Sequence, residues 1–381
     1  MKKVAIFVYS LGGGGAERVA LELALGLKEA YEVEIVTVSP VQKYDNLGVK
    51  VTTLGVHDID SSAFAKLLSL FRLAKVFAGY CKKERVDVVI SFLSRPNIIA
   101  ALSKLINMRV RLIAAEHTTL SNYYGNSLAE KVLKKLLTIS YKSANAVVAV
   151  SEGIKADLVD NFGVKSGAVS VIYNPIDIQK IKLMALQKAN RVTGDGFVFV
   201  TAGRLVESKN YPFLFEAFKS LPSFCKLWVL GSGELESELK FLAVEMGLHE
   251  RITFFGFCEN PYSFFAAADC FVMSSRLEGL PTVLIEALAC GIPVISTDCK
   301  SGPREILGGE ANMLTSGIER AEYGLLASLD TPKFLSLAMT KMIEDDGMRN
   351  QYMLKAKERA EFFSKEKSIT SYKQIIEGDC K

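Results

Sequence analysis

Short apolar, β-branched runs alternate along the chain with longer segments in which apolar residues recur every three or four positions. The first pattern is typical of buried strands and the second of amphipathic helices, so their alternation predicts βαβ units and a parallel sheet. The alternation occurs twice. The predicted strands lie near residues 4–10, 33–38, 49–54, 86–92, 111–116, 146–150 and 169–173, and then near 197–201, 226–230, 252–255, 270–273, 293–296 and 323–326.

The two series are separated by Asn174-Pro175-Ile176-Asp177 and by a polar stretch that ends at Gly196. This break predicts two doubly wound Rossmann-like α/β domains that face a cleft, with the first domain over 1–174 and the second over 175–355. We expect the charged, helical segment 356–381 to pack back on the first domain. Ligands of such sheets bind beyond the carboxyl ends of the strands.

The composition is that of a globular protein: 381 residues, 49% hydrophobic and 23% charged. The seven cysteines are odd in number and nowhere form C-x-x-C, which argues against a disulfide framework and a zinc site. The apolar run after Met1 has only the length of a strand, which is too short for a signal peptide or a membrane span. We therefore expect a cytoplasmic protein.

Charge is distributed unevenly, because residues 1–190 carry 25 basic and 16 acidic side chains while 62–142 alone carry 14 against 4. The bases in this stretch are interleaved with leucine and phenylalanine, a pattern that suits the anionic inner surface of a membrane, and an ordinary solvated helix face is the alternative. Lys82, Lys83, Lys134 and Lys135 are the residues that we expect to contact lipid or a lipid-linked acceptor. Nucleic acid is not expected, because no exposed basic stripe carries stacking aromatics.

The first predicted strand leads into four successive glycines, of which Gly14 and Gly15 open a helix. Glycine lets backbone amides approach an anion at the positive end of a helix. Arg18 stands where the dinucleotide fingerprint needs its third glycine, which disfavours a nicotinamide dehydrogenase.

The second domain opens with a strand that is followed by Arg204 and Lys209. Two cations just past the carboxyl end of a strand suit a diphosphate, which they would stabilise further as it departs.

Further along, Glu278-Gly279-Leu280-Pro281-Thr282 reads as a glycine loop that enters a helix, with Pro281 in the first turn and Gly291 and Pro293 as its end. Amides at the helix start would face a phosphate or sugar oxygen. Glu278 and Glu286 bring two carboxylates, which suit sugar and ribose hydroxyls.

These motifs resemble the family 4 retaining glycosyltransferases of the GT-B fold, whose hallmark E-x7-E matches Glu278 and Glu286. The chain is more narrowly similar to the N-acetylgalactosamine transferases of Campylobacter-type N-linked glycan assembly, through VYSLGGGGAERV, FLSRPN, YNPID and GFCENPY. The resemblance implies that Arg204 and Lys209 hold the diphosphate, Glu286 the ribose, and Glu278 with the neighbouring amides the donor sugar. It also implies a contact of His117 with the donor, for which a structural role is the alternative.

The resemblance further implies a UDP-sugar donor, a polyprenyl-diphosphate-linked glycan acceptor and front-face displacement with retention, without a cofactor. Asp58-Ile59-Asp60 has the D-x-D form of a metal site, but its place before a helix favours capping, so we expect no metal. The alternatives are an O-antigen or capsule hexosyltransferase, a non-hydrolysing UDP-N-acetylglucosamine epimerase and a bilobal solute-binding protein.

Overall fold

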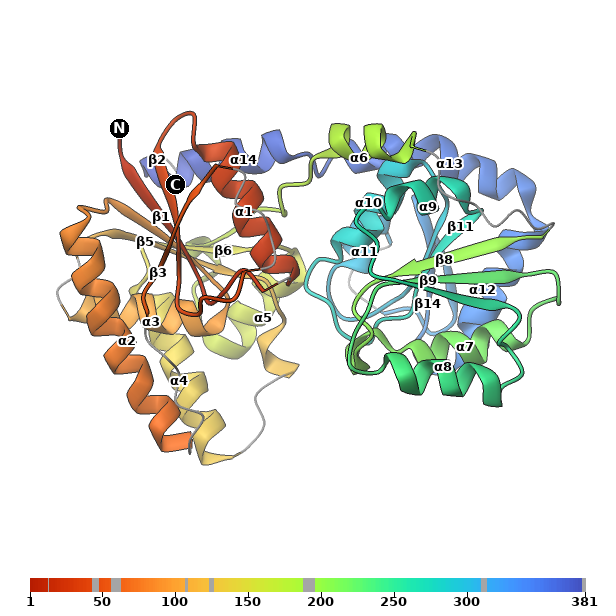
Figure 1. Ribbon diagram of the computed structural model, residues 1–381, viewed down its shortest axis with the longest axis horizontal. Coiled ribbons are helices and arrows are strands. Elements are labelled where there is room, and N and C mark those ends of the chain that lie inside the picture. Colours follow the sequence, from red (N-terminus) through yellow and green to blue (C-terminus); the bar gives the residue numbers. More distant parts are fainter. Residues whose placement is uncertain are drawn as a thin grey trace. The chain divides into compact units, whose positions relative to one another are not determined.

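A computed structural model describes residues 1–12, 14–42, 48–55, 63–106, 109–122, 127–187, 196–309 and 314–378. The chain divides into two compact units (Figure 1). Unit 1 comprises Met1–Ile176 with Lys365–Lys381, and unit 2 comprises Asp177–Ser364.

The first unit is built on a parallel seven-stranded sheet in the order β3-β2-β1-β4-β5-β6-β7. Its central strands are apolar and almost fully buried, as a sheet covered on both faces requires. The strands are β1 (Lys3–Val8), β2 (Glu32–Thr37), β3 (Lys50–Thr53), β4 (Val88–Phe92), β5 (Arg111–Glu116), β6 (Ala146–Ala149) and β7 (Val169–Val171).

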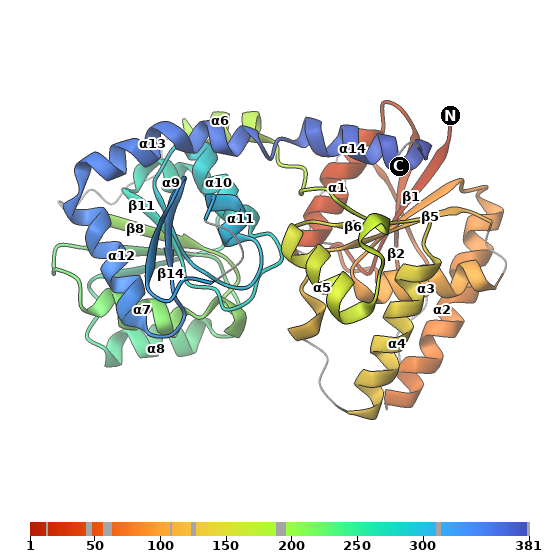
Figure 2. The ribbon, with the colours of Figure 1, turned by 180° about the vertical axis from the view of Figure 1, so that it is seen from behind.

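Helices cover both faces of this sheet. The views from both sides show α1 and α14 on one face and α2, α3 and α4 on the other (Figures 1 and 2). The helices are α1 (Gly15–Leu27), α2 (Ala63–Lys83), α3 (Ser94–Leu105), α4 (Leu128–Ser143), α5 (Glu152–Phe162) and α14 (Lys365–Glu377), with short 3-10 turns η1 (Leu120–Asn122) and η2 (Ser166–Ala168).

The second unit has a seven-stranded sheet in the order β10-β9-β8-β11-β12-β14-β13, in which only the edge strand β13 is antiparallel among the described pairs. Its strands are β8 (Val198–Ala202), β9 (Lys226–Leu230), β10 (Ile252–Gly256), β11 (Cys270–Met273), β12 (Val294–Thr297), β13 (Ile318–Ala321) and β14 (Gly324–Ala327). Its helices are α6 (Ile178–Ala185), α7 (Tyr211–Lys219), α8 (Glu236–Glu245), α9 (Tyr262–Ala267), α10 (Thr282–Cys290), α11 (Pro303–Leu307), α12 (Pro332–Glu344) and α13 (Asp346–Glu361), with the 3-10 turn η3 (Glu207–Lys209).

Two features of the chain differ from the expectation. The segment 356–364 belongs to unit 2, because α13 packs on α10 and buries Ala356 and Ala360, so only the helix α14 returns to unit 1. Strand β13 was not predicted, because its sequence Ile-Glu-Arg-Ala is short, polar and only partly buried.

Candidate functional site

Two loops meet backbone to backbone at the carboxyl ends of β8 and β9. The amide of Gly203 donates to the carbonyl of Leu230 at 3.0 Å, and that of Leu205 donates to Ser232 at 3.0 Å. Gly231, at φ 125°, lies so close that an added Cβ would stand 2.0 Å from the carbonyl oxygen of Gly203. The exposed side chain of Arg204 therefore projects from a segment whose backbone is fixed on both sides.

Lys209 lies on the turn η3 that follows, and this turn is tied to the end of the next strand of the sheet, β11. The hydroxyl of Ser274 donates to the carbonyl of Lys209 at 2.9 Å, and the amide of Arg276 donates to the carbonyl of Ser208 at 2.9 Å. Asn210 takes a left-handed conformation, φ 55°, and ends the turn where α7 begins. Sequence reasoning missed these ties, although hydroxyl residues directly after a strand are a signal for them.

The ammonium group of Lys209 donates to a carboxylate oxygen of Glu278 at 2.6 Å, which brings together two residues predicted for the site from 69 positions apart. Their side chains are 21% and 11% exposed. A pair this sheltered is screened less than a surface pair and keeps both charges in place. Burial, and then the nearby Glu278 carboxylate, raise the pKa of Tyr211, whose hydroxyl donates to the carbonyl of Gly203 at 3.3 Å.

The loop Glu278–Pro281 is held from the end of β12. The hydroxyl of Ser301 donates to the carbonyl of Gly279 at 2.8 Å, and Gly302, at φ 92°, lies where a Cβ would stand 2.4 Å from Cδ of Pro281. Ser301 and Gly302 were not among the predicted residues.

The helix α10 begins at Thr282 with Pro281 as its N-cap, so the proline precedes the helix instead of lying in its first turn. Its predicted end is confirmed, because Gly291 is the left-handed C-cap at φ 80°. Leu280 is buried, and Glu286 is 9% exposed on the second turn of the helix. Glu286, the second carboxylate of E-x7-E, adds to the burial that raises the pKa of Cys290 to about 12.

The glycine loop of unit 1 is organised by its own carboxylate. Glu17, in the first turn of α1, accepts from the hydroxyl of Ser10 at 2.5 Å and from the amide of Gly14 at 3.0 Å. The Gly14 amide that we predicted for a donor anion is thus engaged within the loop, whereas Gly15 is exposed and has nothing within 4 Å of where a Cβ would stand.

His117 follows β5 in unit 1 and is 8% exposed. Its ring stacks on Phe92 with centroids 4.9 Å apart, and its Nε2 atom has no hydrogen-bond partner within the described part of the chain. Burial lowers the pKa of His117 to about 3, so the imidazole is neutral at physiological pH.

The lysines predicted to meet lipid are exposed at 82, 83 and 135 and half-buried at 134. The leucines and phenylalanines interleaved with the bases of 62–142 were expected on the same surface, but three of them belong to the core: Leu73, Phe77 and Leu137. Among the described side chains of α2 and α4, the large apolar residues that are exposed are Leu68 and Phe71, as expected, together with Val132 and Ile139. Phe71 precedes Lys82 by eleven residues, or about 16 Å of helix, so Lys82 and Lys83 lie apart from the apolar part of α2.

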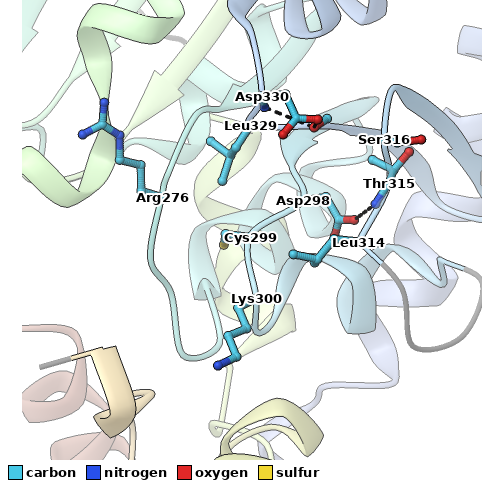
Figure 3. A pocket seen from close by; sticks show the side chains of 10 residues that line it. Arg276, Asp298, Cys299, Lys300, Leu314, Thr315, Ser316, Leu329 and Asp330 are labelled. Atoms are coloured by element: carbon cyan, nitrogen blue, oxygen red, sulfur yellow. Dashed lines mark hydrogen bonds between the residues drawn. The ribbon is translucent and has the colours of Figure 1, made fainter. Parts of the chain in front are cut away.

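A pocket of about 360 Å³ opens at the same sheet edge of unit 2, beyond β12 and β14 (Figure 3). Asp298, Cys299, Leu314 and Leu329 gather around it, while the side chains of Arg276 and Lys300 extend away. The carboxylate of Asp298 is fully buried, accepts from the amide of Thr315 at 2.7 Å and pairs with Arg304.

The described residues contain no cluster of three or more histidine, cysteine or acidic side chains arranged to hold a metal ion. Asp58, Asp60 and the neighbouring His57 lie outside the described residues. None of the helices described is long and apolar enough to cross a bilayer.

Comparison with known proteins decides the family. Residues 13–180 match the family model described as Glycosyltransferase Family 4, and residues 185–359 match Glycosyl transferases group 1. A Campylobacter jejuni protein is 35% identical over 96% of this chain and 97% of its own length. The chain belongs to glycosyltransferase family 4. It is thus a glycosyltransferase, as the E-x7-E motif indicated.

That relative is named as an N-acetylgalactosamine-N,N'-diacetylbacillosaminyl-diphospho-undecaprenol 4-alpha-N-acetylgalactosaminyltransferase. A second C. jejuni relative, 28% identical over 95% of both chains, is named as an α-1,4-N-acetyl-D-galactosaminyltransferase that acts on a longer undecaprenol-linked glycan. Among solved structures, HepE from Anabaena in complex with UDP superposes with a TM-score of 0.78 at 18% identity, over 99% of this chain and all of that one. The fold of this chain is accordingly GT-B.

Proposed function

We propose that this glycosyltransferase moves N-acetylgalactosamine, with retention of configuration, from its UDP derivative to a polyprenyl-diphosphate-linked glycan. Unit 2 binds the donor and unit 1 the acceptor. The donor sugar and the lipid-linked acceptor are those named for the 35% identical relative, and UDP is bound by a structural neighbour of the same fold.

The observation that carries the proposal is the Lys209–Glu278 pair at the carboxyl edge of the second sheet. An ammonium group has three donors, and one serves Glu278, so two remain for diphosphate oxygens. Arg204 adds a second cation that follows the same strand. The backbone that carries each cation is fixed by hydrogen bonds, and Glu278 also holds the ammonium group of Lys209; charges fixed in advance lower a barrier most.

The remaining predicted residues complete the donor site. Glu286 holds the ribose, and neutral His117 offers the sugar a hydrogen bond. Glu278 holds the sugar together with the loop 279–282, in which Gly279, Leu280 and Thr282 have amides that can donate. The departing diphosphate accepts the proton of the attacking hydroxyl on the same face of the sugar. This front-face displacement needs no enzyme nucleophile and no metal, because the cations take the metal's part.

An activity assay tests the proposal. Purified protein is incubated with a panel of UDP-sugars and a short polyprenyl-diphosphate glycan, and the product is identified by mass and by the anomeric signal in NMR. We expect an α-linked N-acetylgalactosamine product, and a turnover lowered by orders of magnitude in Arg204→Ala and Lys209→Ala. The matched control is Lys219→Ala at the exposed end of α7. Transfer of a different sugar, an inverted product or a fully active Lys209→Ala would each contradict part of the proposal.

The acceptor is proposed to be reached at the cytoplasmic face of the membrane, where unit 1 docks peripherally. Lys134 and Lys135 on α4 lie among the exposed Val132 and Ile139, so one helix offers both charge and apolar surface. A basic side chain near an anionic membrane surface contributes about 1 kcal/mol to binding, and salt screens this attraction.

Vesicle co-sedimentation tests the docking. Binding should need anionic lipid, fall as salt rises and weaken in the doubly substituted Lys134→Glu, Lys135→Glu protein. The pair Lys82→Glu, Lys83→Glu should have a smaller effect, because these lysines lie apart from the exposed apolar residues. Binding that ignores lipid charge would refute the docking and leave the transfer reaction untouched.

A further inference from the structure

The last residue of β5, Glu116, is a carboxylate with no exposed surface. One of its oxygens accepts three hydrogen bonds: from the amide of His117 at 2.9 Å, from the amide of Thr118 at 3.1 Å and from the hydroxyl of Thr118 at 2.9 Å. This oxygen therefore fixes the turn of the chain on which His117 stands.

The other oxygen of Glu116 accepts from the phenol of Tyr141 at 2.7 Å. Tyr141 lies on α4, 25 positions along the chain, and is 2% exposed. Its ring meets that of Phe162 edge to face at 6.4 Å, which holds the phenol in place. The carboxylate thus accepts hydrogen bonds on both oxygens, from two different parts of the chain, and cannot rotate without breaking at least one of them.

A buried carboxylate is a costly way to end a strand. The preceding residues of β5, Ala114 and Ala115, are apolar and fully buried, as the middle of the sheet requires. Burial raises the pKa of Glu116, because removal from water disfavours the charged carboxylate. The hydrogen bonds that offset this penalty come from His117, Thr118 and Tyr141, so the carboxylate holds the backbone of its neighbour in one orientation.

The neighbour is the residue that the proposed function places at the donor. The His117 ring is stacked on Phe92, and its Nε2 lacks a partner within the described residues. A neutral ring nitrogen makes one directed hydrogen bond, whose strength depends on where the ring is held.

We propose that Glu116 and Tyr141 are positioning residues that orient His117 toward the donor sugar. This inference rests on the proposed function, which gives His117 its contact with the donor. Glu116 and Tyr141 act through His117 and touch no substrate themselves.

The test is a double-mutant cycle between Tyr141→Phe and His117→Ala in the full chain. Tyr141→Phe removes one oxygen atom and keeps the ring against Phe162. We expect it to lower kcat about tenfold with little change in the donor KM, because small misplacements of a reacting geometry are costly. In the His117→Ala background the same change should have no further effect, because the group that it positions is gone.

Tyr372→Phe is the matched control. Tyr372 is another buried tyrosine of unit 1, 1% exposed, on α14 instead of α4. It should leave kcat unchanged. Glu116→Gln provides a second route should Tyr141→Phe fold poorly: a glutamine keeps the shape and one acceptor, so it should retain more activity than Glu116→Ala. Unfolding midpoints are measured for every variant, and rates are compared well below them.

The outcomes separate the inference from the proposed function. Absence of transfer by the unaltered protein with every UDP-sugar, or full activity of His117→Ala, would refute the proposed function or the role of His117 within it, and the inference with them. The inference alone would be overturned if His117→Ala is impaired and the double variant loses activity by the product of the two single losses. A Tyr141→Phe variant as active as Tyr372→Phe would also overturn it.

Discussion

Replacing Gly231 by alanine tests whether the backbone around Arg204 must be held where it is. A Cβ at this position would stand 2.0 Å from the Gly203 carbonyl oxygen, whereas real Cβ contacts stay above 3.0 Å, so one of the two backbones must move by about 1 Å. The amide of Gly231 donates to the carbonyl of Gly256 at 2.6 Å, so the β9 side resists the move. The segment 203–205 would shift instead, and Arg204 with it.

The magnitude follows from this geometry. Overpacking typically costs about 1–3 kcal/mol, and a displacement of 1 Å in a catalytic geometry costs about 100-fold in rate. Gly247→Ala is the control, because Gly247 also has a positive φ, 70°, but nothing lies within 4 Å of where its Cβ would stand. Both variants carry backbone strain, and only Gly231→Ala carries the clash.

Stability is measured by urea unfolding, monitored by circular dichroism. Activity is measured as initial rates at varied UDP-sugar concentration. Gly231→Ala should lose about 1–3 kcal/mol more stability than Gly247→Ala and about 100-fold in kcat/KM for the donor. Equal stability and equal rates in the two variants would show that the loops do not meet as described and that Arg204 does not depend on them.

Four further outcomes are expected. Lys209→Met should lower kcat by a factor that corresponds to about 3 kcal/mol while the unfolding midpoint changes little; unchanged kcat would contradict a diphosphate contact. Glu286→Ala should mainly raise the donor KM, and Glu278→Ala should mainly lower kcat at saturating donor. Equal effects on both constants in both variants would contradict the separate roles given to the two carboxylates. Arg304→Met should cost about 3–5 kcal/mol of stability, because it leaves the buried Asp298 carboxylate without its cation. The control is Lys240→Met, which removes the solvent-accessible pair between Lys240 and Glu236 on α8 and should cost about 1 kcal/mol or less. EDTA should leave transfer intact, and inhibition that manganese reverses would point to a metal site.

Much of the fold could be predicted because both sheets are covered on two faces. Strands such as β5 and β9 then read as continuous apolar runs, and their predicted limits, 111–116 and 226–230, coincide with those of the structure. The end of α10 was equally visible, since Gly291 and Pro293 follow it, whereas its start was placed too early, at Pro281. The edge strand β13 lacks such a run, because one side of it has no neighbour to bury it.

The site was predictable in part for a related reason. Charged residues and glycines after a strand stand out in the sequence, which singled out Arg204, Lys209 and Glu278. The groups that hold them do not, because Ser274 and Ser301 are ordinary serines whose role depends on which strands are neighbours. The corrected assignment of 356–364 has the same origin: whether a charged helix packs on one unit or the other is decided by contacts distant in sequence, here with α10.

Strand order supplies what the sequence alone lacks. In unit 2 the order β10-β9-β8-β11-β12 places β8 between β9 and β11, and the chain reverses its direction of travel across the sheet at the β8/β11 boundary. In open α/β sheets this switch point is where two loops diverge and leave room for a ligand. The loop after β8 carries Arg204 and Lys209, and the loop after β11 carries Glu278, so their ion pair spans the switch point. The outer neighbours β9 and β12 then contribute Gly231 and Ser301, which brace the two loops from either side.

Unit 1 repeats the order around β1 and β4, which places its glycine loop at the equivalent boundary and His117 one strand further along, after β5. The positions of the candidate residues within each unit therefore follow from the order of the strands in its sheet, because each residue lies in the loop that follows one of these strands.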